Sequence, residues 1–389
     1  ALDFLKRLFR PCADARTLVS LILYGRKSAH MDRTNQHMLL GLSLGHAAHD
    51  TWYGVAPVLL AALSSQMKLS NAEIGLVLML YQGISSLTQP FFGRLSERVG
   101  GRLLGMSAIL WTTAMFTGTL FAQTKWLLFV LISLAGLGSG AWHPQGFATA
   151  TLSGGERWKA TAAAIFFLGG TLGSAFIGAA LGGWLLGQFG RPSLLIISAI
   201  TIAMALFIVR TMVPTKTLIT HKAGEGASLT SGNNKQSFWA MLALLLAATA
   251  FRSLTVNSLN TYVPKFEQDL GVRPETYGLL MSLFLAAMAV GGVSGSYLAD
   301  RIGINVILIG SMLLAAILCV PFVRGTGLLS HVGLILTGFM VGPSHTLLVV
   351  SGQRQFPHRM ATATGIFLGF NFVSGAVGAW VLGLAADKV

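Results

Sequence analysis

The chain has 389 residues, of which 53% are hydrophobic and only 10% are charged. A soluble protein carries about 25% charged residues, so this composition excludes a soluble multidomain enzyme and indicates a membrane protein. The two cysteines, Cys12 and Cys319, are too few for a disulfide scaffold or a cysteine-based zinc site. The formal net charge of +14 suggests a nucleic-acid partner only until the basic residues are placed along the chain.

The N-terminal segment, residues 1–35, combines basic residues with apolar stretches that are too short to cross a membrane. Leu5 and Phe9 alternate with Lys6 and Arg10. This pattern predicts an amphipathic segment that lies on the cytoplasmic surface of the membrane. A docking segment for a partner protein is the alternative interpretation.

Eleven apolar runs follow, and each is long enough to form a membrane-spanning helix of roughly 20 residues. They lie near 37–63, 72–92, 103–123, 126–150, 159–188, 192–212, 237–263, 276–298, 304–323, 327–351 and 360–386. The sequence therefore predicts an all-α protein embedded in a lipid bilayer.

The basic residues assign the two sides of the membrane. If the segment before the first span is cytoplasmic, 19 of the 27 lysines and arginines fall on that side, and Arg252 lies within a span. The remaining seven are Lys68, Lys125, Arg191, Lys265, Arg273, Arg324 and Lys388. This asymmetry predicts a cytoplasmic N-terminus. The positive charge is thus a topology signal with some attraction to anionic lipid, and no nucleic-acid partner is expected.

An internal repeat of about 202 residues relates the two halves of the chain. Residues 93–100 recur as 296–303, and Gly140 and His143 recur as Gly342 and His345. In the first span of each half, His46, Asp50, Tyr53 and Pro57 align with Ser253, Asn257, Asn260 and Pro264. Parallel halves of this kind predict a transporter with six helices in each half.

The repeat also predicts the domain organisation. Two helix bundles are expected at residues 36–212 and 237–389, joined by a cytoplasmic linker at 213–236, where Gly, Ser, Asn and Lys accumulate. Because the eleventh run matches the fifth, the six-plus-six arrangement lacks its last helix in this sequence. We expect that the chain is trimmed.

These motifs resemble the major facilitator superfamily over about residues 36–389. Glu97-Arg98-Val99-Gly100, repeated as Asp300-Arg301-Ile302-Gly303, is similar to that superfamily's signature loop. Gly45 to Asp50, Trp142-His143-Pro144 and Phe251-Arg252-Ser253 resemble the fosmidomycin-resistance branch, whose members are bacterial proton-coupled efflux proteins. Gln145 stands where we expect an acid in that branch. The resemblance implies the two-bundle fold and a place in the bacterial inner (cytoplasmic) membrane.

The ionisable groups inside the spans are the candidate functional residues, because charge is costly within a bilayer. Asp50 is the acid that sits well inside a span, and His46 shares its helix face at four-residue spacing. We predict that Asp50 and His46 couple transport to protons. A structural ion pair is the alternative.

Arg252 is the basic residue within a span, and its planar fork suits a carboxylate or phosphonate. A structural partner role for Arg252 is the alternative interpretation. The resemblance implies that the first and fourth helices of each half line the cavity. The predicted solute-binding residues are Tyr53, His143, Gln145, Arg252, Asn257, Asn260 and His345.

The signature loops are predicted gates. Glu97 and Arg98 in the first half, and Asp300 and Arg301 in the second, would hold the cytoplasmic helix ends together through charge pairs and helix dipoles. No metal site is predicted, because no short liganding motif is present, and His49 points about 60° away from the His46–Asp50 face. No cofactor is expected either.

Two functions follow from these patterns. The first is a secondary transporter that exports a small anionic or amphiphilic organic solute in exchange for protons. The second is a non-transporting accessory or assembly subunit built on the transporter fold, with residues 1–35 as its docking segment. An enzyme is not expected, because no nucleophile–base arrangement or nucleotide-binding loop stands out.

Overall fold

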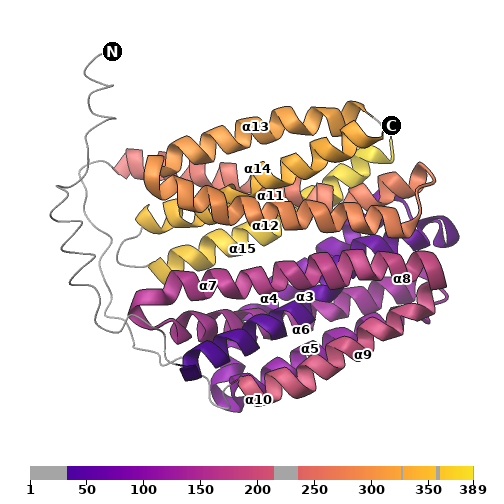
Figure 1. Cartoon of the computed structure of the whole chain (residues 1–389), viewed down its shortest axis with the longest axis horizontal. Helices are drawn as coiled ribbons and strands as arrows, with labels where there is room; N and C mark the ends of the chain where they lie inside the picture. Colours follow the sequence, from indigo (N-terminus) through magenta and orange to yellow (C-terminus); the bar gives the residue numbers. More distant parts are fainter. Residues whose placement is uncertain (1–32, 214–234, 326, 356–359, 389) are drawn as a thin grey trace.

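The computed structural model describes residues 33–213, 235–325, 327–355 and 360–388, and over these residues it contains helices and no strand (Figure 1). The helices of the first half are α3 (Arg33–Met67), α4 (Asn71–Val99), α5 (Gly101–Thr119), α6 (Lys125–Ser153), α7 (Gly155–Leu172), the π-helical η1 (Gly173–Leu181), α8 (Gly182–Phe189), η2 (Arg191–Leu194), α9 (Leu195–Ala203), the π-helical η3 (Met204–Val209) and α10 (Arg210–Met212). Those of the second half are α11 (Lys235–Asp269), α12 (Pro274–Ile302), α13 (Ile304–Arg324), α14 (Leu328–Gln355) and α15 (Met360–Ala386).

Each half forms its own bundle of roughly parallel helices (Figure 1). Eight helical stretches of the described residues are long and apolar enough to cross a membrane. The three other long helices, α3, α4 and α5, fall outside this set. One of them, α3, carries His46, His49 and Asp50 among its inward-facing residues. The predicted all-α membrane fold is confirmed.

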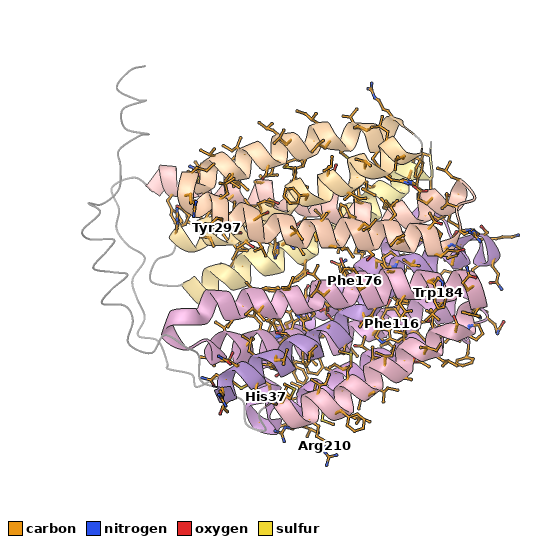
Figure 2. The ribbon with its side chains drawn as sticks, in the orientation of Figure 1. His37, Phe116, Phe176, Trp184, Arg210 and Tyr297 are labelled. Carbon is orange, nitrogen blue, oxygen red and sulfur yellow. The ribbon has the colours of Figure 1, made fainter. Side chains whose placement is uncertain are left out.

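The outer surface of the bundles is apolar. Phe176 and Trp184 are about half exposed, at 51% and 47%, whereas Phe116 is completely buried (Figure 2). Val323 and Phe207, each 72% exposed, also point outward. Many large apolar side chains on the outside fit a surface that contacts lipid rather than water, because water penalises exposed apolar area.

The 202-residue repeat recurs in the helices themselves. Both α3 and α11 have 35 residues, and both α4 and α12 have 29. A proline lies inside α6 (Pro144) and inside α14 (Pro343), three residues before the position that exactly matches Pro144. Proline removes one backbone hydrogen bond within each of these helices.

The two bundles touch closely at one end, which we call the Asp387 end after the residue that follows α15. The Asp387 carboxylate accepts hydrogen bonds from the backbone N–H groups of Asn71 and Ala72, at 2.8 Å and 2.9 Å, and so caps the start of α4. Nearby, a Cβ added to Gly183 of α8 would lie 2.9 Å from the Cα of Gly278 in α12. Backbones this close require glycine.

The predicted domain boundaries stay predictions. Residues 1–32 and the core of the predicted linker, 214–234, lie outside the described residues. Helix α3 begins at Arg33, so the last three residues of the expected N-terminal segment belong to the first long helix. The physical reason is that a helix can continue past the hydrocarbon, where polar residues such as Asn35 and Gln36 meet water.

Candidate functional site

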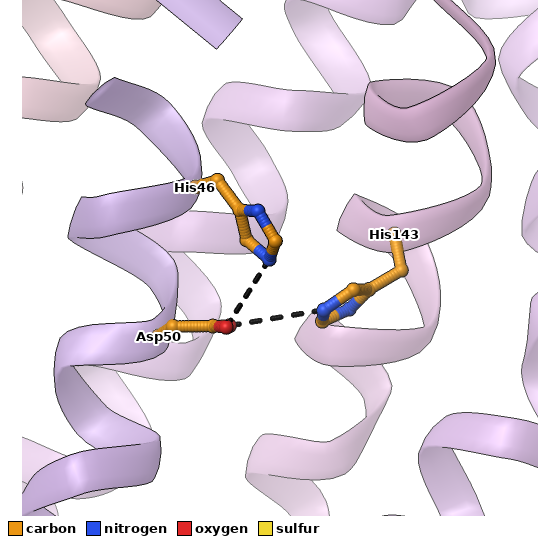
Figure 3. Close-up of side chains that lie close together, drawn as sticks. All are labelled: His46, Asp50 and His143. Carbon is orange, nitrogen blue, oxygen red and sulfur yellow. Dashed lines mark ion pairs between the residues drawn. The ribbon is translucent and has the colours of Figure 1, made fainter. Parts of the chain in front are cut away.

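Helix α3 places His46 and Asp50 one turn apart on the same face. The Nε2 atom of His46 lies 3.1 Å from Oδ2 of Asp50 (Figure 3). His46 is 2% exposed, whereas the Asp50 side chain retains 20% of its accessible surface. The histidine of this pair is therefore buried, whereas the carboxylate remains partly accessible.

The protonation of His46 is constrained by a backbone carbonyl. Its Nδ1 lies 2.8 Å from the carbonyl oxygen of Phe166 in α7. A carbonyl can only accept, so Nδ1 carries a hydrogen and donates it. The Nε2 atom then faces the Asp50 carboxylate at 3.1 Å, within ion-pair distance but without the geometry of a hydrogen bond. A proton at this face would make the contact attractive, because two lone pairs at this distance repel each other.

His143 approaches Asp50 from α6 in the same way. Its Nε2 lies 3.7 Å from Oδ1 of Asp50, and its Nδ1 lies 2.9 Å from the carbonyl oxygen of Ser139 (Figure 3). The carbonyl again fixes a hydrogen on Nδ1, so Nε2 is the atom that faces the carboxylate. The longer distance makes His143 a weaker partner than His46.

A third histidine, His49, completes the surroundings of Asp50. Its Nδ1 lies 3.0 Å from Oδ1 of Asp50, and its Nε2 lies 3.4 Å from Oγ1 of Thr112 in α5. His49 is fully buried, and its ring stacks on that of Trp142. Sequence reasoning placed His49 off the His46–Asp50 face and did not count it as a site residue. The sequence feature that could have identified His49 is its position directly before Asp50.

The cluster has the chemistry to hold a small cation. His46, Asp50 and His143 each offer one ligand atom, and these atoms lie within 4.8 Å of one another. A proton between His46 and Asp50, 3.1 Å apart, is the smallest cation that the cluster could hold. That no resident metal or cofactor is needed stays a prediction.

Tyr53 and Asn257 link the two bundles beside this cluster. The Tyr53 hydroxyl donates to Oδ1 of Asn257 at 3.3 Å, and the Gln82 amide donates to the same oxygen at 3.2 Å. Asn260 also lies within hydrogen-bonding reach of Tyr53. The structure therefore brings three of the predicted solute-binding residues together between α3, α4 and α11.

Arg252 lies in the second bundle with uncharged partners. Its Nε donates to Oγ of Ser344 at 3.3 Å, and its Nη1 donates to Oδ1 of Asn371 at 3.2 Å. The residue is 7% exposed, and no carboxylate of the described residues forms an ion pair with it. A buried cation held only by neutral groups has capacity left for an anion.

The other two predicted solute-binding residues are placed differently. His345 of α14 meets the ring of Phe167 in α7 at 6.3 Å, and Phe167 in turn lies 6.1 Å from the His46 ring. Gln145, in contrast, is fully buried, and its Nε2 lies against Gly105 of α5. The structure thus leaves Gln145 inside the first bundle, apart from the Asp50 cluster and Arg252.

The predicted gates are described only in part. The side chains of Glu97 and Asp300 lie outside the described residues. Arg98 and Arg301 are exposed, and Arg301 donates a hydrogen bond to the Tyr297 hydroxyl while its guanidinium lies 4.5 Å from the Tyr297 ring centroid. The charge pairing expected in these loops stays a prediction.

Several polar residues of the site were missed by sequence reasoning. Gln82, Ser344 and Asn371 contact Asn257 or Arg252, and a search for amides and hydroxyls inside the predicted spans would have found them. Glu267 is a second buried acid, 3% exposed near the end of α11, where His331 pairs with it at 3.1 Å. It was missed because α11 continues beyond the apolar run that ends near residue 263.

Comparison with known proteins gives consistent matches. The sequence profile of the Major Facilitator Superfamily matches residues 42–379. The fosmidomycin resistance protein of Escherichia coli (strain K12) is 25% identical over 363 residues, which cover 91% of this chain and 87% of that protein. An uncharacterized MFS-type transporter of Bacillus subtilis (strain 168) is 25% identical, over 90% of this chain and 86% of the relative.

Solved structures give the same fold. A bacterial homolog of the human lysosomal transporter Spinster, in an inward-facing and unoccupied conformation, superimposes with a TM-score of 0.75. The match covers 92% of this chain and 84% of that one at 16% sequence identity. At this identity the match concerns the fold alone.

Proposed function

Because this chain belongs to the Major Facilitator Superfamily, we propose that it exports a small anionic or amphiphilic organic solute in exchange for protons. The family makes it a multi-pass secondary transporter rather than an enzyme. In our proposal Asp50 and His46 carry the proton, and Arg252 binds the anionic group of the solute.

The observation that carries the proposal is the 3.1 Å approach of His46 Nε2 to the Asp50 carboxylate, a contact that a proton would stabilise. The Phe166 carbonyl keeps the hydrogen on Nδ1, so any change in protonation takes place at the face that meets the carboxylate. Asp50 remains 20% accessible, which gives that proton a route out. A site that gains and loses one proton as it opens to each side is the minimum that proton coupling needs.

The solute class follows from Arg252. Its guanidinium is always charged, and Ser344 and Asn371 leave it without a counter-charge among the described residues. A carboxylate or phosphonate would supply that charge through paired hydrogen bonds. Tyr53 lies near both Asp50 and Arg252, and with its partner Asn257 it would contact the body of the solute.

The direction of transport is supported by the name of the Escherichia coli relative, a fosmidomycin resistance protein. Resistance fits export. We further propose that the protein resides in a bacterial inner membrane with its N-terminus cytoplasmic, on the basis of the 19 basic residues on that side against seven on the other. The gating role of Glu97, Arg98, Asp300 and Arg301 remains part of this proposal.

The test is transport by the purified full chain in proteoliposomes. Fosmidomycin is the first probe, followed by a panel of anionic and neutral drugs. We expect an imposed pH gradient to drive the uptake of an anionic probe, and Asp50→Asn to abolish the gradient-driven flux while solute exchange without a gradient continues.

The Asp50→Asn variant keeps size and polarity but cannot carry the proton. If it still shows gradient-driven flux near the wild-type rate, the proton site lies elsewhere and the proposal is wrong. Stoichiometric purification with a larger membrane complex, together with no flux of any probe, would favour the accessory-subunit alternative.

A further inference from the structure

The cluster around Asp50 offers the ligands of a metal ion as well as a place for a proton. His46 and Asp50 come from α3 and His143 from α6, and their three ligand atoms all lie within 4.8 Å of one another (Figure 3). Two imidazole nitrogens and one carboxylate oxygen form a set that zinc uses where it keeps one coordination position open. The sequence predicts no metal site because no short motif contains this set, and only the fold brings His143 to the other two.

The distances within the cluster are close to those around a tetrahedral ion. Ligand atoms around tetrahedral zinc lie about 3.4 Å apart, because the bonds to nitrogen and oxygen are about 2.1 Å long. Asp50 lies 3.1 Å from His46 and 3.7 Å from His143, on either side of that value. The widest separation is at most 4.8 Å and exceeds it by about 1.4 Å, so the side chains would close around the ion as it binds.

The Nε2 atom of His46 is a ligand atom without a partner. The His46 side chain is 2% exposed, and no hydrogen bond from the described residues reaches Nε2. Because Nδ1 donates its hydrogen to the Phe166 carbonyl, a neutral His46 ring has its lone pair on Nε2, directed at Asp50 (Figure 3). A buried nitrogen in this position has lost its hydration without compensation, and a metal ion would use its lone pair.

The histidines are also held as metal ligands usually are. A metal-binding imidazole typically donates its other ring N–H to a carbonyl or carboxylate, which fixes the ring and makes the binding nitrogen more basic. The Phe166 carbonyl does this for His46 at 2.8 Å. The Ser139 carbonyl does it for His143 at 2.9 Å. The carboxylate is supported in turn, since Nδ1 of His49 lies 3.0 Å from its Oδ1.

The accessible side of the cluster and its mixture of ligands indicate which ion it would take. The side chains of Asp50 and His143 retain 20% and 19% of their accessible surface, so an ion can approach from their side. Three protein ligands leave the fourth position of a tetrahedral ion for water. Imidazole together with carboxylate suits zinc, whereas magnesium and calcium take mainly oxygen ligands.

We propose that His46, Asp50 and His143 bind one zinc ion and that the bound ion blocks transport. Binding of the ion is independent of the proposed function, whereas the block rests on it. The ion would occupy Nε2 of His46 and the carboxylate of Asp50, the same atoms at which the proposed function places the proton. Neither atom can take up a proton while it binds the metal. Zinc is thus an inhibitor that enters from solution, distinct from a resident cofactor.

Binding is tested with Co²⁺, which replaces zinc and absorbs visible light in a tetrahedral site, on the full chain purified in detergent and treated with a chelator. We expect Zn²⁺ to displace the bound Co²⁺ and Mg²⁺ to leave it in place. His46→Gln and His143→Gln should each weaken binding at least about ten-fold. His37→Gln is the matched control, because His37 is exposed on the same helix α3 (Figure 2). Wild-type Co²⁺ affinity in both cluster variants would overturn the site.

A cysteine substitution identifies a ligand directly and does not depend on how well the glutamine variants fold. In His143→Cys a thiolate would replace the imidazole, and a Co²⁺–thiolate bond gives a charge-transfer absorption band that a merely structural role of His143 cannot produce. We expect this band in His143→Cys and in neither the wild type nor Thr151→Cys. Thr151 lies on the same helix, where its hydroxyl donates to the Phe147 carbonyl. A folded His143→Cys protein without the band would overturn His143 as a ligand.

The block is tested in proteoliposomes with an imposed pH gradient. Zn²⁺ at a concentration that displaces Co²⁺ should reduce gradient-driven flux of the wild type several-fold, and a chelator should restore it. Mg²⁺ at the same concentration should leave the flux unchanged. Full flux in the presence of saturating Zn²⁺ would overturn the block. Gradient-driven flux near the wild-type rate in Asp50→Asn contradicts the proposed function instead, and the Co²⁺ absorption still decides whether the metal site exists.

Discussion

The Tyr53 hydroxyl donates a hydrogen bond at 3.3 Å to the side-chain oxygen of Asn257, a residue 204 positions later in the chain. The same oxygen accepts a second bond from Gln82, and the Asn257 amide group donates to the Ser253 carbonyl at 3.0 Å. One side chain of the second bundle is therefore tied to two helices of the first. Any movement that separates the bundles at this level has to break both bonds.

Replacing Asn257 should open the bundles. Asn257→Leu removes two hydrogen bonds of about 1 kcal/mol each, so the population separated at the Asp387 end should rise by up to about 30-fold. Spin labels at Gln123 and Asp269, both exposed, report the separation through distance measurements. Thr255→Leu is the control, because Thr255 is exposed on the same helix and bonds only to its own backbone at Phe251. An unchanged distance distribution in Asn257→Leu would show that the hydrogen bonds from Tyr53 and Gln82 to Asn257 do not hold the two bundles together.

The histidines of the cluster should differ in importance. His46→Gln removes the ring whose Nε2 lies 3.1 Å from Asp50, whereas His143→Gln removes a partner at 3.7 Å. We therefore expect a larger loss of gradient-driven flux in His46→Gln, with exchange preserved in both. The flux assay at several pH values measures this. Equal losses would mean that the 3.1 Å contact has no special role.

Arg252 should determine the affinity for anionic solutes. A hydrogen bond to a charged group contributes about 1.5–3 kcal/mol, so Arg252→Gln should weaken the binding of an anionic probe roughly 10- to 100-fold. Arg252→Lys should recover part of this loss, since lysine keeps the positive charge but lacks the paired N–H donors of the guanidinium. Binding isotherms for anionic and neutral members of the probe panel test the prediction. An equal loss for neutral probes would indicate a structural role instead.

The close contact of α8 and α12 should require glycine. In Gly183→Val the added Cβ would lie 2.6 Å from the Pro274 carbonyl oxygen and 2.9 Å from the Cα of Gly278, so the two helices must move apart. The Gln123–Asp269 distance should lengthen. Gly310→Val is the control, because nothing lies within 4 Å of a Cβ at Gly310. An unchanged Gln123–Asp269 distance in Gly183→Val would show that the contact between α8 and α12 does not hold the Asp387 end closed.

The cap on α4 should depend on pH only in strong acid. Partial burial raises the pKa of Asp387, but the hydrogen bonds from Ala72 and Asn71 lower it more, so the pKa lies below its ordinary value. A carboxyl with a lowered pKa contributes stability above its ordinary pKa of about 3.9, and this stability is lost as the pH falls through the lowered value. The closed population should therefore be constant at neutral pH and decrease only below about pH 4.

Asp387→Asn provides the comparison for this cap. An amide has one acceptor oxygen and no charge, so it cannot replace both hydrogen bonds. The variant should be less closed than the wild type at neutral pH, and the difference should vanish in strong acid. A difference that persists there would mean that the charge of Asp387 is not what holds the contact.

Much of the site was accessible from the pattern of single helices. His46 and Asp50 meet because four-residue spacing puts them on one face of α3, and Arg252 stands out because a charge inside an apolar run is costly. Gln145 shows the limit of this reasoning. It was singled out because it stands where the resemblance leads us to expect an acid, but a place in the sequence does not specify which neighbour a side chain faces, and Gln145 turns toward α5.

The sequence by itself determined the all-α membrane fold, the two related halves and the charges of Asp50 and Arg252 within the spans, because apolar length, repeat spacing and charge placement are properties of the chain alone. Only the tertiary structure decided which side chains meet across helices. His143 reaches Asp50 from α6, the Phe166 and Ser139 carbonyls fix the hydrogens of the two histidines, and Asn257 joins the bundles. The physical reason is that a hydrogen bond depends on distances of a few tenths of an ångström. Such distances depend on how closely glycine-lined backbones approach, which no periodicity in the sequence specifies.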